Sequence, residues 1–191
     1  MKVNIHTHHP KNDELTLWSI GIHPYDAEGA TTDTLLAVER TAAEYNAIGE
    51  IGLDFSRAID REVQIQLLQA QLDIAQKDGK GVVLHCVKAF ETVMDILKNY
   101  SLKFVIFHGF IGSPEQAKRA IEKGYFLSFG DPSFASPRTV LALEQTPLSS
   151  LFLESDERPV TIEDIYAKAA VIKRVTIDEL KNSILENYDK K

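Results

Sequence analysis

The sequence contains a single cysteine, Cys86, among its 191 residues. One cysteine cannot form an intrachain disulfide, and a reducing compartment is the natural setting for such a chain. No apolar run approaches the roughly 20 residues that a membrane-spanning helix needs. The segment Met1–His6 has no apolar core of the kind that a signal peptide carries. We therefore expect a cytoplasmic protein that does not associate with membranes.

The sequence also has no excess of basic residues. Lysine and arginine total 21, against 28 aspartates and glutamates, which gives a formal net charge of −7. This excess of acidic residues argues against non-specific binding of nucleic acid by a positively charged surface. It does not exclude a metal site that handles phosphates, because bound cations would dominate the local electric field.

Repeats, low-complexity tracts and linkers are absent from the sequence as well. Hydrophobic residues make up 44% and charged residues 26% of the chain, which is typical of an ordinary globular protein. The length predicts one domain spanning residues 1–191. A core of that size needs neither disulfides nor a structural metal.

Short β-rich runs alternate with longer helical patterns along the chain. We predict strands at Lys2–Ile5, Leu15–Ile22, Ala47–Leu53, Gly81–His85, Lys103–Phe107, Tyr125–Phe129 and Leu151–Glu154. We predict helices at Asp33–Tyr45, Arg61–Lys77, Phe90–Asn99, Pro114–Lys123, Pro137–Glu144, Ile162–Arg174 and Ile177–Asn187, and a frayed tail at Asn187–Lys191. This alternation predicts an α/β fold with a parallel sheet and helical crossovers.

Histidines and carboxylates gather at the ends of these strands. His6 and His8 follow the first strand, and their spacing of two points both to the same face. Two further strands run directly into His85 and His108. The carboxylates of this set are Glu50, within the third predicted strand, and Asp156, just after the last.

These histidines and carboxylates are suited to binding divalent metal ions. In parallel α/β folds the carboxyl ends of the strands meet at one edge, where sites are built. Imidazoles and carboxylates together suit zinc, manganese or nickel. A single histidine at a strand end is more often a satisfied polar residue than a ligand. Glu50 is harder to explain in that way, because an unpaired carboxylate in an apolar strand would be costly.

The order of these motifs resembles the TatD family of metal-dependent deoxyribonucleases. The resemblance runs from about residue 3 to about residue 188, and the string Gly49-Glu50-Ile51-Gly52-Leu53-Asp54 is its most specific part. The other matching segments are His6-Thr7-His8, Gly21-Ile22-His23-Pro24, Leu84-His85-Cys86, Phe107-His108-Gly109-Phe110 and Leu153-Glu154-Ser155-Asp156.

The resemblance implies a distorted TIM-type barrel with outer helices and a centre of two divalent ions, which could be zinc, manganese, nickel or magnesium. It implies that the metal ligands are His6, His8, Glu50, His85, His108 and Asp156. Within this set, His6, His8 and Asp156 would hold one ion, His85 and His108 the second, and Glu50 would bridge the two. His23 would then face a substrate phosphate.

Three departures from the family pattern bear on fold and substrate. The loop His9–Glu14 is short where family members carry an extra helix–strand–helix block, so we predict an incomplete barrel of about seven parallel strands. Val87 stands at the usual position of an arginine, and Lys88 could replace its charge. One residue is inserted in the segment Glu154–Pro159.

The leading hypothesis is a hydrolase that cleaves phosphodiesters of DNA ends or short oligonucleotides, bound weakly. Two bridged cations would lower the pKa of a water molecule, and Asp156 with Glu50 would carry the catalysis, Asp156 as general base. His23 and Lys88 would contact the substrate. One alternative is a hydrolase of another small substrate, such as a phosphomonoester, amide or lactone. The other is a non-catalytic metal-binding or scaffold protein. No obligate protein partner is evident.

Three other residues have simpler interpretations. We predict that Cys86 is a buried and inert thiol rather than a nucleophile. Trp18 lies in a predicted strand and is expected in the core. Asp54 either orients a metal ligand or caps the next segment, and we favour the orienting role.

Overall fold

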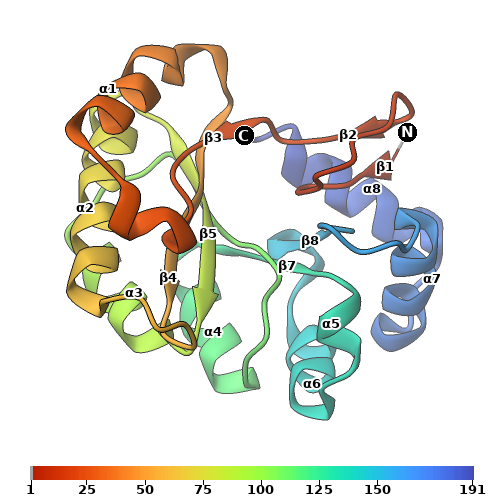
Figure 1. Cartoon of the computed structure of the whole chain (residues 1–191). Helices are drawn as coiled ribbons and strands as arrows, with labels where there is room; N and C mark the ends of the chain where they lie inside the picture. Colours follow the sequence, from red (N-terminus) through yellow and green to blue (C-terminus); the bar gives the residue numbers. More distant parts are fainter. Residues whose placement is uncertain (1) are drawn as a thin grey trace. The chain divides into compact units, whose positions relative to one another are not determined.

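The computed structural model of the chain describes residues 2–191 and shows two compact units (Figure 1). Unit 1 is made of Met1–Leu17 with His108–Lys191, and unit 2 is Trp18–Phe107. The first residues therefore fold with the second half of the chain. The single domain expected from the sequence stays a prediction.

Unit 2 contains a parallel sheet with helices packed along it. Its strands follow the order β3, β4, β5, β6, and every pairing between them is parallel. The strands are β3 (Ser19–Ile20), β4 (Ala47–Asp54), β5 (Gly81–Val87) and β6 (Val105–Phe107). The helices are α1 (Thr32–Thr41), α2 (Arg61–Lys77) and α3 (Phe90–Leu97), with 3-10 turns η1 (Pro24–Gly29) and η2 (Ala42–Glu44).

Helix α2 covers β4 and β5 in this unit (Figure 1). It begins after Asp60, whose carboxylate accepts hydrogen bonds from the backbone N–H groups of Glu62 and Val63. Such a cap satisfies donors that the first helical turn leaves open. Leu68 and Leu72 recur at a spacing of four and are buried, as a helix with one apolar face requires.

Two buried glutamines on α2 hold neighbouring backbone. The Gln71 side chain accepts from the Ile22 N–H at 2.6 Å and donates to the Ile22 carbonyl at 3.0 Å. Gln64 makes the same pair of bonds to Asp54, at 2.8 and 3.1 Å. Each amide thereby supplies the two hydrogen bonds that a neighbouring strand would give. The backbone before His23 and at the end of β4 is fixed in this way.

Strand β4 has a bulge at Gly49 and Glu50. Ile48 pairs with Val82 and Ile51 with Leu84, so two residues of β4 stand opposite one residue of β5. A bulge of this kind re-aims the side chain that it contains, here Glu50. The β4 backbone also approaches β5 closely at Gly52, where φ is +144° and a Cβ would lie 1.9 Å from the His85 carbonyl oxygen.

Unit 1 contains two pairs of parallel strands. The first pair is β1 (Lys2–Val3) with β2 (Glu14–Leu15), and the second is β7 (Phe126–Phe129) with β8 (Leu151–Leu153). The helices are α4 (Pro114–Glu122), α5 (Asp131–Phe134), α6 (Pro137–Gln145), α7 (Ile162–Lys173) and α8 (Ile177–Tyr188), with a 3-10 turn η3 (Leu148–Ser150).

Buried polar side chains join the C-terminal helices to the strands of unit 1. The Tyr166 hydroxyl on α7 donates to the Val3 carbonyl at 3.0 Å. On α8, the Asn187 amide donates to the carbonyls of Leu148 and Leu151 at 2.7 and 3.0 Å. The expectation that the tail frays from Asn187 is therefore wrong at its first residue, since Asn187 is buried and bonded.

Most predicted elements are present, with ends that differ by a few residues, and the α/β class with parallel strands is confirmed. The predicted strand Leu15–Ile22 is wrong. The chain changes partner within it, because the Leu17 N–H donates to Ile5 whereas the Trp18 carbonyl accepts from the Asn46 N–H. Residues 2–191 consequently contain eight short strands instead of about seven. Trp18 is 57% exposed and is not in the core.

Within residues 2–191, the helices are too short or too polar for any of them to traverse a bilayer. The longest helix is α2, and its outward face carries charged residues such as Glu62 and Lys77.

The close approach at Gly52 gives a test of the fold. Gly52→Ala should lower the free energy of unfolding by at least about 3 kcal/mol, because the new Cβ would meet the His85 carbonyl and strain a positive φ. Gly29→Ala is the matched control, since nothing lies within 4 Å of its Cβ position, and it should change stability by about 0.5 kcal/mol or less. Urea unfolding followed by circular dichroism measures both. Equal midpoints for the two variants would contradict the close packing of β4 on β5.

Candidate metal centre

The two N-terminal histidines lie beside Asp156 in unit 1. Thr7 forms a parallel bridge with Asp156. In this bridge the Asp156 N–H donates to the His6 carbonyl at 3.2 Å, and the His8 N–H donates to the Asp156 carbonyl at 3.3 Å. The Nε2 atoms of His6 and His8 lie 3.7 and 3.5 Å from Asp156 Oδ1. The structure thus brings three of the sequence-predicted ligands together.

The backbone at Asp156 is held in an uncommon conformation. Its φ is 53°, a left-handed value that aspartate and asparagine adopt more readily than most residues. Asn4, which is 1% exposed, fixes the preceding residue: its amide donates to Ser155 Oγ at 2.9 Å, and its carbonyl accepts from the Ser155 N–H at 3.0 Å. The direction of the Asp156 side chain therefore depends on a buried amide of the first segment.

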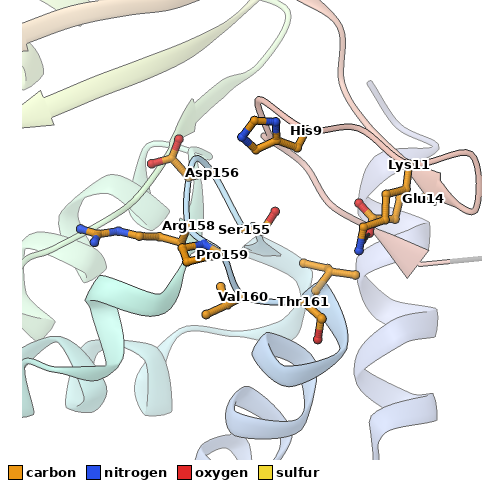
Figure 2. A pocket seen from close by; sticks show the side chains of 10 residues that line it. His9, Lys11, Glu14, Ser155, Asp156, Arg158, Pro159, Val160 and Thr161 are labelled. Carbon is orange, nitrogen blue, oxygen red and sulfur yellow. Dashed lines mark ion pairs between the residues drawn. The ribbon is translucent and has the colours of Figure 1, made fainter.

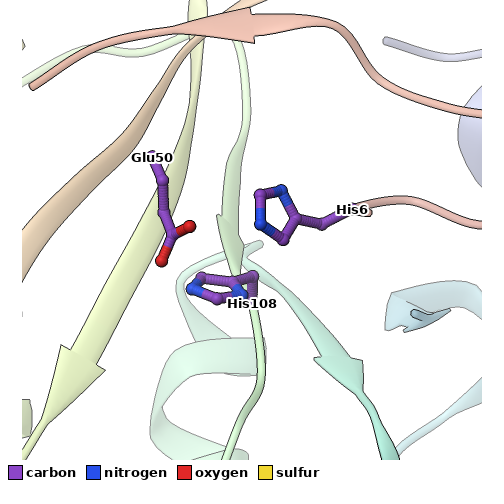
Figure 3. Close-up of side chains that lie close together, drawn as sticks. All are labelled: His6, Glu50 and His108. Atoms are coloured by element: carbon purple, nitrogen blue, oxygen red, sulfur yellow. The ribbon is translucent and has the colours of Figure 1, made fainter. Parts of the chain in front are cut away.

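His108 is the third histidine of unit 1. Its ring centroid lies 4.6 Å from that of His6 (Figure 3), and its Nδ1 lies 3.2 Å from Oε1 of the buried Glu154. Burial by itself would raise the pKa of the Glu154 carboxyl, but the charge of His108 and the hydrogen bonds to it hold that pKa below its usual value. A carboxylate on one ring nitrogen orients the imidazole and leaves the other nitrogen for a metal.

Glu50, which Figure 3 also labels, belongs to unit 2. There its Oε1 lies 2.9 Å from His85 Nδ1 and 3.3 Å from His23 Nε2. One ligand atom from each of these three side chains lies within 4.8 Å of the others. The bulge in β4 and the end of β5 thus bring Glu50 and His85 together. They also place His23, which was predicted as a substrate contact, where it could equally bind a metal.

Asp54 lies at the end of β4 and is 2% exposed. Its Oδ2 lies 3.3 Å from His85 Nε2 and accepts a hydrogen bond from the Tyr25 hydroxyl at 3.1 Å. Burial would raise the pKa of this carboxyl, but hydrogen bonds from Ser56, His85 and Tyr25 keep the pKa lowered. These contacts support the interpretation that Asp54 orients a predicted ligand.

Of the residues after His85, Cys86 was predicted to be an inert thiol and Lys88 to contact the substrate. Burial raises the pKa of the Cys86 thiol to about 12, so the thiol is protonated at neutral pH and is a poor nucleophile. Lys88 is exposed and has a φ of 53°. The predicted role of Lys88 with substrate stays a prediction.

Both groups of side chains fit a divalent cation chemically. In unit 1 the ligand atoms of His6, His8 and Asp156 lie within 4.8 Å of one another, as do those of His108, Glu154 and Asp156. Borderline cations such as zinc prefer imidazole nitrogen with carboxylate oxygen. Asp156 belongs to both sets, which makes it the central carboxylate of unit 1.

Glu154 is the residue of this site that the sequence interpretation missed. It was placed in a predicted strand and in a segment that matches the family, but it was given no role, although it follows the apolar run Leu151-Phe152-Leu153. The argument that singled out Glu50, that a carboxylate in an apolar strand needs a partner, applies equally to Glu154. Asn4, Gln64 and Gln71 were missed as well, and they too are polar residues in buried positions.

Comparison with known proteins gives a family match over residues 4–190, to the family described as TatD related DNase. The chain is 31% identical over 192 residues to the uncharacterized metal-dependent hydrolase YjjV of Escherichia coli, covering 88% of this chain and 73% of that protein. It is 35% identical over 116 residues to the 3'-5' ssDNA/RNA exonuclease TatD of Erwinia tasmaniensis, covering 58% of this chain and 45% of that protein.

A solved structure agrees with these sequence matches. The crystal structure of the TatD homologue YjjV from Escherichia coli superposes with a TM-score of 0.84 and 27% identity, covering 94% of this chain and 77% of that one. This likeness supports the predicted fold class, and the family match extends over almost the whole chain. The chain therefore belongs to the TatD related DNase family.

Proposed function

We propose that this chain is a divalent-metal-dependent hydrolase of phosphodiesters, acting on DNA ends or short oligonucleotides. The metal ligands of the proposal are His6, His8, Glu50, His85, His108 and Asp156. The observation that carries it is the convergence of His6 and His8 on one oxygen of Asp156 in unit 1. The names of relatives, which include a metal-dependent hydrolase and an exonuclease acting on ssDNA and RNA, point to the same chemistry.

Bound divalent cations would lower the pKa of a nearby water molecule and offset charge that develops on a phosphoryl oxygen. The residues of the chain supply the rest. The Asp156 carboxylate, whose side chain is one-third exposed, can accept a proton from that water. Glu154 orients His108, and Asp54 orients His85. We keep two ions as the proposed number, and zinc, manganese, nickel and magnesium as the candidates.

His23 is proposed to contact a substrate phosphate from unit 2. Its Nδ1 accepts from the Tyr25 N–H at 3.1 Å and so caps the turn η1. The opposite ring nitrogen, Nε2, faces Glu50. The His23 ring thus caps η1 through one nitrogen and faces Glu50 through the other. A substitution that keeps the cap but loses the second nitrogen can separate the two roles.

Glu50→Gln tests the metal ligation. The change removes a negative charge that would offset the bound cations, so metal content should fall by at least half while the protein stays folded. Elemental analysis beside circular dichroism measures both properties. Glu44→Gln, at an exposed position of the same unit, should keep the metal content of the wild type. Full metal retention in Glu50→Gln would show that this carboxylate is not a ligand.

Asp156→Asn tests the general base. Asparagine tolerates the left-handed backbone and keeps one oxygen at the site, so the loss should fall on kcat, by roughly 10²–10⁴-fold. Steady-state hydrolysis of a single-stranded oligonucleotide, beside a phosphatase and esterase panel, measures it. Asp189→Asn, exposed on the last turn, is the control. If kcat is undiminished in Asp156→Asn, this residue is not the general base. If the wild type hydrolyses none of the substrates, the scaffold alternative is favoured.

His23→Ala and His23→Asn together test the substrate contact. Asparagine is a good capping residue, so His23→Asn should keep the turn η1 but lose the nitrogen that faces Glu50. Both variants should lower kcat/KM for a phosphodiester by at least tenfold, and only His23→Ala should also lower stability, by about 1 kcal/mol. If His23→Asn has wild-type kcat/KM, then His23 is only a cap.

A further inference from the structure

Unit 1 contains a cavity of about 250 Å³ that the proposed mechanism does not use. One wall comes from the segment that contains His9, Lys11 and Glu14, and the other from residues after Asp156 (Figure 2). Asp156 itself lines the cavity. The cavity therefore adjoins the central carboxylate of the metal-binding group in the same unit.

Both walls are segments in which the sequence was interpreted as departing from the family pattern. In that interpretation the loop His9–Glu14 is short, and the run from Glu154 to Pro159 carries one inserted residue. The metal-binding histidines of unit 1 precede these segments or lie elsewhere in the chain. Two of the three interpreted departures thus border one cavity, whereas the third, Val87, lies in β5 of unit 2. The cavity is therefore a candidate for substrate selection.

The cavity combines an apolar side with a polar edge. Pro159, Val160 and Ile162 line it with apolar surface. At the polar edge, Lys11 Nζ lies 3.6 Å from Glu14 Oε1, and the Asn4 amide donates to the other Glu14 oxygen at 2.8 Å. The Glu14 side chain is only 4% exposed, so its carboxylate is a fixed acceptor next to a mobile ammonium donor.

This chemistry fits a flat heteroaromatic ring better than a bare phosphate. A phosphate would meet Lys11 and Arg158, but it would also face two carboxylates, Glu14 and Asp156, and would gain little from the apolar wall. A nucleobase presents both N–H donors and ring or carbonyl acceptors at its edge, and an apolar face on either side. The volume of the cavity is of the size that one base needs, and not a longer segment.

We propose that this cavity binds the base of the terminal nucleotide of a single-stranded substrate. Glu14 accepts from a base N–H, Lys11 donates to a base acceptor, and Val160 with Pro159 contacts the ring face. The phosphodiester attached to that nucleotide then extends toward Asp156. This inference rests on the proposed phosphodiester hydrolysis. It specifies that the terminal base is the part of the substrate that the protein recognises.

Binding of single-stranded tetranucleotides with phosphorothioate linkages, followed by fluorescence anisotropy in the presence of magnesium, tests the inference. One probe carries all four bases, and two others lack the base at the 3' or the 5' end. In the wild type, loss of one terminal base should raise Kd by at least about fivefold. Val160→Phe fills the cavity and should reduce this ratio to below about twofold. Val171→Phe makes the same change on an exposed part of α7 and should keep the wild-type ratio.

Lys11→Ala provides a second variant at an exposed side chain, in case Val160→Phe perturbs folding. It should also reduce the ratio, whereas Lys123→Ala, exposed at the end of α4, should not. The inference is overturned if the wild type binds the probes with equal affinity, if it binds none of them, or if both cavity variants keep the wild-type ratio. Hydrolysis of bis(p-nitrophenyl) phosphate, which has no base, reports on the proposed function separately. If the protein hydrolyses this compound but does not discriminate between the probes, the proposed function is supported and the proposed role of the cavity is wrong.

Discussion

Carboxylates buried beside imidazoles are the interaction on which both units depend. Removing a carboxylate from water is costly unless hydrogen bonds or an opposite charge compensate. Glu154 meets this requirement through His108, and Asp54 through His85 and Tyr25. Each carboxylate therefore fixes the ring of a histidine that is itself a predicted ligand, so the geometry of the candidate site is set by the same contacts that make the burial tolerable.

A second layer of polar side chains holds the backbone to which these groups are attached. Asn4 accepts from the backbone N–H of Ser155 and donates to its hydroxyl. Gln64 and Gln71 each accept from a backbone N–H and donate to the carbonyl of the same residue, Asp54 and Ile22 respectively. A side-chain amide can replace a strand neighbour because it offers one donor and one acceptor at the right spacing. The chain thus fixes the direction of its chemically active residues at points where regular sheet pairing ends.

The histidines and Glu50 could be singled out from the sequence as candidate ligands, because strand ends and isolated charges stand out in an apolar background. Helix α2 was predicted with both ends correct, since its cap and its apolar face agree. The strand Leu15–Ile22 was not predicted correctly. Its residues look continuous in sequence, but Leu17 and Trp18 bond to different partners, and a change of partner is a tertiary event that no local pattern records. The bulge at Glu50 escaped prediction for the same reason, because it exists only in relation to β5.

The physical constraints also differ between the residues proposed to bind metal and those proposed to recognise substrate. A metal ligand tolerates little displacement, so its position is best set by strands, buried amides and glycines such as Gly52 that allow close backbone approach. Recognition of the remainder of a substrate tolerates more variation and can reside in loops. The segments His9–Glu14 and Glu154–Pro159 contribute residues to the cavity beside Asp156, whereas Asn4 and the bridge at Thr7 hold the backbone there. Variation in these two segments would therefore alter the surroundings of Asp156 more readily than the contacts that fix its direction.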